Sequence, residues 1–385
     1  MNRRGFLAAG CACAMHLAPG IARAQTDWVA PPRFTRPELA SDEGGLWSMM
    51  DREETKLRRS PFAIRDRGLR DYVQSVACRL VGDHCPDIRV HLVRTPLFNA
   101  NVAPNGMMQV WSGLLLRMEN EAQLAAVLGH EIGHYLERHS LDRLRDIKSR
   151  TAFSQFLGLF GVVGAVGQLT MLAGALAYSR DQERDADRIG VALMHKAGYD
   201  AAEATKVWGN LLLEIKARPG RDAAGANPMF ATHPAPEERQ ETLTRLAQAV
   251  PGGVTNEDAW RDRMRPFRLE WLLEEVKRGQ HEESIALLTR MIDHMPAQAA
   301  DALYARGEVY RLRAQDGDLD AATGDLQAAL ALPAAPPESH RALGLIHRLK
   351  GRYGEAKESF RRYLDLVPHA PDIPLIRSYM EEISA

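Results

Sequence analysis

The residues with the clearest chemical potential lie in one stretch, Leu128–His134, which contains His130, Glu131 and His134. Because an α-helix turns about 100° per residue, histidines four positions apart lie on one face, one turn from each other. Two imidazoles at this spacing can bind a single zinc ion. Glu131 flanks that face, where it would accept a proton from the attacking water and leave the metal to the histidines. We therefore predict one Zn²⁺ per chain, with Glu131 as the catalytic base.

The surrounding residues favour a helix. Asn120 can cap its start, with Gln123 three residues later, and an apolar, alanine-containing run follows. We expect this helix to continue to about His139 or beyond. His139 would then point away from the metal, because it lies roughly half a turn round from His130. A surface helix that carries two histidines by chance is the alternative, and the third ligand must come from elsewhere in the chain.

A charged stretch at residues 179–188 offers that third ligand. Glu183 and Asp187 are four residues apart on a helix that we expect to run to about Lys196. Glu183 would complete a His-His-Glu set and leave the fourth position open for water, as catalytic zinc sites require. Asp187 could hold a ligand histidine through its second ring nitrogen. The ordinary alternative is a surface helix whose acidic residues pair with its own arginines.

His233 and Arg239 are further catalytic candidates. Either side chain could donate a hydrogen bond to the oxyanion of a tetrahedral intermediate. His233 could instead bind the zinc itself and keep the enzyme inactive. The sequence leaves these two roles of His233 open.

Three short segments before the metal-binding helix have the pattern of strands. Residues 88–93 alternate between apolar and polar, and 98–102 and 107–111 flank a turn at Pro104–Gly106. We expect a small antiparallel sheet. Its edge could pair with an extended peptide and present the scissile bond to the metal, although a purely structural sheet is an equally ordinary interpretation.

The N-terminus has the pattern of an export signal. Arg3–Leu7 resembles the twin-arginine signal, an apolar stretch follows, and Ala22–Ala24 offers small residues for cleavage after Ala24. A short membrane anchor fits less well, since Pro19 and Arg23 interrupt the stretch. The predicted location of the mature protein is the periplasm. Its remaining cysteines, Cys78 and Cys85, are then candidates for a disulfide, with two inert thiols as the alternative.

The rest of the composition limits the partners. Acidic and basic residues nearly cancel, with a formal net charge of −1, so nothing suggests nucleic acid as a partner. Residues 151–179 carry no formal charge and are long enough to cross a bilayer, but a single crossing would separate His130 from Glu183. Two options remain open: a pair of short helices covering the active site, or a hairpin that makes peripheral membrane contact.

Three spaced motifs together resemble one known family. His130-Glu131-x-x-His134, Glu183-x-x-x-Asp187 and Thr232–Pro234 with Arg239 are similar to the HtpX and CAAX-prenyl-protease type of zinc endopeptidase. The resemblance covers about residues 65–245, and Asn99–Ala103 matches the strand that these enzymes place beside the metal. It implies a gluzincin fold with Glu131 as general base. The export signal and the lack of a clear pair of spanning helices indicate an exported branch of this family.

The C-terminal third has a different, repetitive pattern. Gly351–Pro368, Gly279–Pro296 and Gly317–Pro333 enclose similar spacings, which resemble the paired helices of tetratricopeptide (TPR) repeats. Such repeats build a concave surface that binds other proteins. Their alternative role is to brace the protease domain.

Together these patterns predict a mainly α-helical protein with a small antiparallel β-sheet, in which a gluzincin-type zinc protease domain precedes an α-solenoid of TPR helix pairs. We expect the function to be that of an exported zinc metalloendopeptidase acting on unfolded or misassembled envelope proteins in outer-membrane protein quality control, with envelope assembly proteins bound by the TPR region. The main alternative is a periplasmic chaperone or assembly scaffold with a largely latent protease site; an exopeptidase fits less well. The expected divisions of the chain are a signal peptide (1–24), an N-terminal extension with a helix (25–64), the metallopeptidase domain (65–250), a linker (251–265) and the TPR-like repeats (266–385).

Overall fold

The structure is a computed structural model that describes residues 28–143, 178–218, 227, 229–230, 233 and 236–383. The expected signal peptide lies outside the described residues, and so does the apolar segment 151–179 except for its last two residues. The elements used below are α2 (Asp42–Arg59), α3 (Arg67–Val81), β1 (Arg89–Val93), β2 (Ala100–Val102), β3 (Met107–Trp111), α4 (Ser112–Arg117), α5 (Glu121–Leu136), α9 (Arg180–Lys196), α10 (Ala202–Ala217), α12 (Pro236–Gln248), α13 (Glu257–Lys277), α14 (His281–His294), α15 (Ala300–Arg313), α16 (Asp318–Leu330), α17 (Glu338–Leu349), α18 (Tyr353–Leu366) and α19 (Ile373–Glu382).

The described part is mainly helical, as predicted, and it contains a three-stranded sheet with the order β1-β3-β2. The predicted antiparallel pairing is wrong for one of the two strand pairs. β2 and β3 form the expected antiparallel hairpin, but β3 pairs with β1 in parallel, with Val90 opposite Met108. The short connection after β1 reverses the chain before β2, so the returning β3 inserts between them and runs in the direction of β1. β2 is therefore left at the edge of the sheet.

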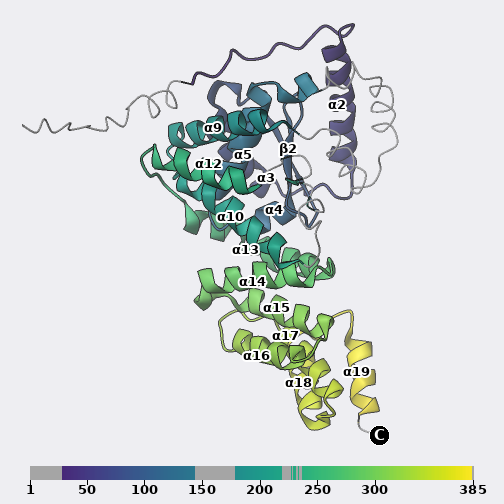
Figure 1. The fold of residues 1–385 in the computed structure, drawn as a ribbon. Coiled ribbons are helices and arrows are strands. Elements are labelled where there is room, and N and C mark those ends of the chain that lie inside the picture. The colour runs from purple at the N-terminus through teal and green to yellow at the C-terminus, as the bar shows by residue number, and fades with distance from the viewer. Residues whose placement is uncertain are drawn as a thin grey trace, which may run out of the picture.

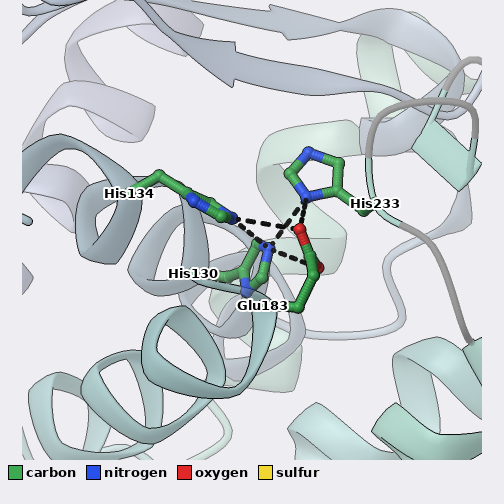
Figure 2. Close-up of side chains that lie close together, drawn as sticks. All are labelled: His130, His134, Glu183 and His233. Carbon is green, nitrogen blue, oxygen red and sulfur yellow. Dashed lines mark hydrogen bonds and ion pairs between the residues drawn. The ribbon is translucent and has the colours of Figure 1, made fainter. Parts of the chain in front are cut away.

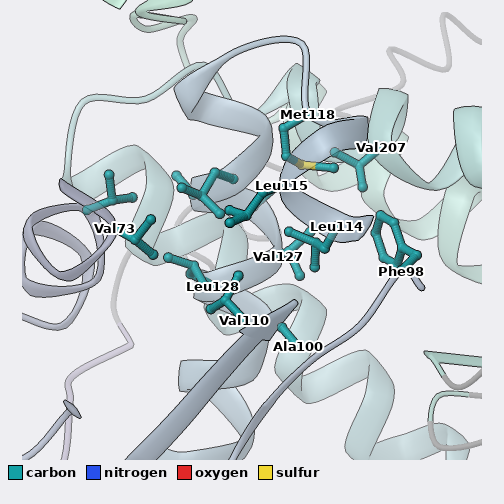
Figure 3. Close-up of a cluster of buried hydrophobic side chains, with 14 of the residues drawn as sticks. Val73, Phe98, Ala100, Val110, Leu114, Leu115, Met118, Val127, Leu128 and Val207 are labelled. Atoms are coloured by element: carbon teal, nitrogen blue, oxygen red, sulfur yellow. The ribbon is translucent and has the colours of Figure 1, made fainter. Parts of the chain in front are cut away.

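Helix α5 lies at the centre of the body that contains the sheet, packed among α3, α9, α10 and β2 (Figure 1). Asn120 caps it by accepting a hydrogen bond from the backbone N–H of Gln123, as the sequence indicated. Its apolar residues, among them Val127 and Leu128, join β3 and α4 in one core (Figure 3). Every residue of α5 is buried. The side chains on every face of α5 are therefore packed against other parts of the protein.

Helices α5 and α9 approach closely because glycines line their contact. A Cβ atom on Gly133 would lie 3.0 Å from the backbone of Ala186, and one on Gly190 would lie 3.0 Å from the backbone nitrogen of His130. Such distances leave no room for a methyl group without moving one backbone. The glycines bring the side chains of α9 within reach of the histidines on α5.

Residues before the sheet also pack on this body. The extended segment from Trp28 leads into α2, and the indole nitrogen of Trp28 donates a hydrogen bond to Glu137, just beyond α5. Glu43 on α2 forms an ion pair with Arg138, whose guanidinium also lies over the ring of Phe34. The N-terminal segment and α2 thereby hold the turn that follows α5.

The C-terminal helices α13 to α19 continue from the base of this body as a stack of helices (Figure 1). Neighbouring helices contact each other in chain order from α14 to α18, as a repeat array would, and the assignment of these helices as TPR repeats stays a prediction. Helix α13 begins at Glu257, within the expected linker at 251–265, and the expected division of the chain stays a prediction. Trp260 on α13 is buried and donates a hydrogen bond to the carbonyl of Met118.

A buried ion cluster joins the two parts. Arg117 at the end of α4 contacts Glu214 of α10 at 2.7 Å and Glu275 of α13 at 3.1 Å, and all three are buried. Arg290 of α14 adds a 2.9 Å contact with Glu214. Apolar residues of α13, α14 and α15 belong to the same core cluster as those of α5. The C-terminal helices thus begin inside the core that supports α5.

Among the described residues, no helix combines the length and the apolar character needed to cross a bilayer.

Candidate metal centre

Four side chains from three regions of the chain converge on one buried point: His130 and His134 of α5, Glu183 of α9, and His233 (Figure 2). His130 Nε2 lies 3.1 Å from both His134 Nε2 and His233 Nδ1. Glu183 Oε1 lies 2.9 Å from His233 Nδ1 and 3.4 Å from His134 Nε2. The three residues that the sequence nominated as ligands are therefore brought together, and His233 stands among them.

This donor set fits a metal ion. His130 Nε2 has one lone pair and faces two other imidazole nitrogens, so it cannot accept a full hydrogen bond from both, and the buried Glu183 Oε2 lacks a hydrogen-bond partner. A cation among the four donors removes both defects. Ligand atoms about 2.0–2.1 Å from a tetrahedral zinc are about 3.4 Å apart. Four of the distances between the donors, 2.9 to 3.4 Å, are close to that value, and all four ligand atoms lie within 4.8 Å of one another.

The electrostatics of the site favour a cation. Burial lowers the pKa of His130 to about 4, with the charge of Arg239 acting in the same direction, and burial also lowers the pKa of His134. Burial opposes the charged form of Glu183, but the charges of His233 and Arg239 hold its pKa well below the usual value. Neutral imidazoles at His130 and His134 beside an ionised Glu183 are the protonation states that bind a divalent metal. Burial opposes the charged form of His233, but the charges of Glu183 and Glu131 raise its pKa, so this ring must release its extra proton when it joins them at a metal.

His130 is supported by charged groups behind it. Its Nδ1 lies 2.9 Å from Asp187 Oδ1, the contact that the sequence suggested for Asp187. Arg239 bonds to Asp187 at 2.6 Å and lies 3.0 Å from the same ring nitrogen. The guanidinium of Arg239 also packs on Trp208 of α10, 3.7 Å from the ring centroid. Arg239 thus contacts both His130 and Asp187, the residue that supports His130. The sequence had suggested a different role, in which Arg239 donates a hydrogen bond to the oxyanion of the substrate.

The end of α5 differs from the prediction. The helix stops at Leu136, and Arg138 adopts a left-handed backbone conformation with φ 57°. The chain therefore turns back, and His139 does not point away: its Nδ1 lies 2.9 Å from Nδ1 of His134. Burial lowers the pKa of His139.

Tyr178 is a second neighbour of His134 that the sequence did not reveal. Its ring stacks on that imidazole, with centroids 3.8 Å apart and planes 17° apart, and its hydroxyl is hydrogen-bonded to Ser140. Tyr178 and Trp208 lie in ordinary helix-like sequence, with no spacing that marks them. Only their proximity to the histidines identifies them.

Glu131 is buried beside this cluster and beside the edge strand. Burial raises its pKa to about 7, the charge of His233 lowers it, and a backbone hydrogen bond from Val102 of β2 also lowers it. Its Oε1 lies 3.5 Å from His233 Nε2 and has no hydrogen-bond partner. A carboxylate with this pKa can take up and release a proton near neutral pH.

The sulfur atoms of Cys78 and Cys85 are bonded in the structure, at 1.96 Å. The bond links the end of α3 to the turn before β1, far along the chain from the metal ligands. It supports the fold and supplies no group to the metal centre.

A buried His-Glu-x-x-His helix completed by a glutamate from a second helix is the arrangement of a metallopeptidase. Residues 63–247 match the family model described as Peptidase family M48. The chain therefore contains a peptidase M48 domain, and this match includes all four donors.

Relatives with curated names agree with this family. The chain is 28% identical over 257 residues to the "Beta-barrel assembly-enhancing protease" of Yersinia pestis, an alignment that covers 60% of this chain and 51% of the relative. It is 28% identical over 228 residues to the protein of that name from Escherichia coli (strain K12), covering 53% and 45%. It is 32% identical over 156 residues to "Mitochondrial metalloendopeptidase OMA1" of Arabidopsis thaliana, covering 40% and 31%. The chain thus spans about half the length, or less, of these relatives.

Proposed function

We propose that this protein is a zinc metalloendopeptidase that hydrolyses peptide bonds of unfolded or misassembled envelope proteins, in outer-membrane protein quality control. The observation that carries the proposal is the buried donor set of His130, His134, Glu183 and His233 with Glu131 beside it. Two relatives are named for β-barrel assembly, which supports an envelope role. The export-signal pattern at residues 1–24 agrees with action in the periplasm.

Zinc is the metal that this donor set suits best, since three imidazoles and one carboxylate prefer zinc over magnesium or calcium. When bound, zinc would polarise the scissile carbonyl and make a water molecule more acidic. Glu131 would accept the proton of the attacking water and pass it to the leaving amine, a task that suits its pKa of about 7. Asp187 and Arg239 would hold His130 in place from behind.

The edge strand gives the substrate a place to bind. β2 pairs with β3 on one side, and a hydrogen bond links its residue Val102 to Glu131. An extended peptide added at this edge would lie beside the catalytic base. Strand addition depends on hydrogen bonds to the peptide backbone more than on particular side chains, so it selects segments that are free to become extended. This agrees with unfolded chains as substrates.

The position of His233 supports the rival function, a chaperone or assembly scaffold with a latent protease site. Its Nδ1 occupies the fourth place of the donor set, where catalysis requires water. We propose that the conformation described here is a resting state, and that His233 withdraws when a substrate binds. The C-terminal helices would then supply TPR-like binding to envelope assembly proteins in either function.

The test compares Glu131→Gln with wild type in the full-length mature protein. Glu131→Gln should bind zinc as wild type does and lose nearly all cleavage of an unfolded model protein. Glu183→Ala, which keeps only the three histidines of the donor set, should lose cleavage and also bind zinc much more weakly. The exposed Glu237→Gln on α12 is the control and should change neither. Substantial cleavage by Glu131→Gln, with contamination excluded, would remove Glu131 from the mechanism. If Glu131→Gln restored the envelope integrity of a deletion strain as fully as wild type does, the result would favour the scaffold function over the protease function.

A further inference from the structure

The two ligand histidines of α5 are supported in different ways. Nδ1 of His130 faces the carboxylate of Asp187 at 2.9 Å. Nδ1 of His134 faces another imidazole nitrogen, that of His139, also at 2.9 Å. Both second partners are buried. One histidine is therefore held by a carboxylate and the other by an imidazole.

The chemistry of imidazole dictates the direction of the second hydrogen bond. A neutral histidine that binds a metal through Nε2 carries its proton on Nδ1. His134 presents Nε2 to the other donors, so its Nδ1–H must be the donor toward His139. His139 Nδ1 must then be the acceptor, and the proton of His139 must be on its Nε2.

We propose that His139 is a positioning residue for the metal centre: it accepts the Nδ1–H of His134 and so fixes the tautomer and the ring orientation of that ligand. The inference rests on the proposed metal site, because it takes His134 as a ligand through Nε2. It adds a residue to that site which touches neither metal nor substrate.

The neighbouring contacts show why His139 can do this. The left-handed conformation of Arg138 reverses the chain and brings the ring of His139 against Nδ1 of His134. Glu43 of α2 forms an ion pair with Arg138. The residue after His139, Ser140, bonds to Tyr178, whose ring covers the face of His134. The turn that contains His139 and Ser140 thus restrains the imidazole of His134 in two ways. His139 contacts its Nδ1, and Tyr178, which is hydrogen-bonded to Ser140, stacks on its face. Its anchor on α2 lies before the residues matched by the family model.

The first experiment measures zinc affinity by competition with a chelator, using the full-length mature protein. His139→Phe keeps a ring of similar size and lacks an acceptor, so zinc affinity should fall by about 10–100-fold. His139→Asn places an acceptor oxygen near the position of Nδ1 and should restore most of that loss. His84, which is equally buried and bonds to the carbonyl of Pro31, provides the control: His84→Phe should leave zinc affinity unchanged.

Each outcome decides a separate point. Equal affinity of wild type and His139→Phe overturns the inference and leaves the metal site intact. Equal weakening by Phe and Asn also overturns it, because the loss would then come from packing. A wild-type protein that binds no zinc refutes the proposed function itself.

A second measurement needs no variant and therefore covers the case in which His139→Phe fails to fold. In zinc-loaded wild type labelled with ¹⁵N in histidine, NMR should show His134 protonated at Nδ1, His139 protonated at Nε2, and a coupling between the two Nδ1 atoms across the hydrogen bond. A proton on Nδ1 of His139 overturns the inference.

Discussion

Helices α5 and α18 are of similar length and lie in very different surroundings. All 16 residues of α5 are buried, whereas α18 buries Ala356, Phe360 and Tyr363 out of 14. α18 follows the usual pattern of one apolar stripe with a solvated polar face. α5 has no such face, so each of its polar side chains must find a partner inside the protein. The candidate metal ligands therefore lie where the chain is enclosed, whereas the C-terminal helix α18 leaves most of its surface to water.

The largest expected difference is between a charge buried in the body that contains α5 and a charge exposed on α18. Arg117 at the end of α4 is the buried example. Arg117→Met should lower the free energy of unfolding by about 3–5 kcal/mol, because the buried Glu214 and Glu275 lose the cation that they share. Of the ion pairs among the described residues, Glu214 would keep only the one with Arg290, and Glu275 only the one with Arg278. Arg361→Met on α18, whose ion pair with Glu358 is exposed, should change it by at most about 0.5 kcal/mol. Urea unfolding measures both. Adding Glu275→Leu to Arg117→Met should recover part of the loss, and equal effects of the two arginine changes would contradict the contrast.

Metal removal should come next in size. Stripping zinc from a protein held at a free zinc concentration 100 times its dissociation constant should lower its stability by about 2.7 kcal/mol. Thermal unfolding with and without a chelator gives the value. Glu183→Ala, which keeps three of the four donors and should bind zinc much more weakly, is the control and should respond less to the chelator. A response as large as that of wild type would mean that the metal binds elsewhere.

A methyl group at the contact between α5 and α9 should cost about 1–3 kcal/mol. The Cβ atom in Gly133→Ala would meet the backbone of Ala186 at 3.0 Å, and separating the helices would move Glu183 away from the histidines. We therefore expect weaker zinc binding together with lower stability. Unchanged zinc affinity would show that α9 can move away from α5 without displacing Glu183 from the metal site.

The same substitution in the helix array should have a small opposite effect. Gly324 lies inside α16, and a Cβ atom there would meet nothing within 4 Å. Gly324→Ala should raise the free energy of unfolding by about 0.5–1 kcal/mol through helix propensity alone. A loss of stability there would show that α16 is packed as tightly as α5.

The sequence predicted those parts of the site that depend on local spacing. His130 and His134 lie one turn apart because α5 is regular between them, and the start of α9 follows from its cap at Ser179. The end of α5 was missed because the left-handed residue is Arg138, where a glycine or asparagine would have signalled it. That single dihedral angle decides where His139 points.

The parts decided by tertiary packing could not be predicted from one sequence. Alternation and the turn at Pro104–Gly106 indicated the strands, but neither signal says which strand lies between the other two, so the order β1-β3-β2 and its parallel pair were not predicted. Trp208 was not predicted because its ring packs on Arg239 from another helix. The separation of the two parts near residue 251 was expected from composition, and the burial of Trp260 shows that the core extends past that point.

The distances along the chain between the four donors bear on the order of events in folding. His130 and His134 form a local pair, but His130 and His233 are 103 residues apart and Glu183 and His233 are 50 apart. Contacts over such separations form late, since long loops must close first. Two histidines alone would hold zinc weakly, so the metal cannot act as an early template. Tight zinc binding would instead mark chains in which α5 and α9 have docked and His233 has reached its place.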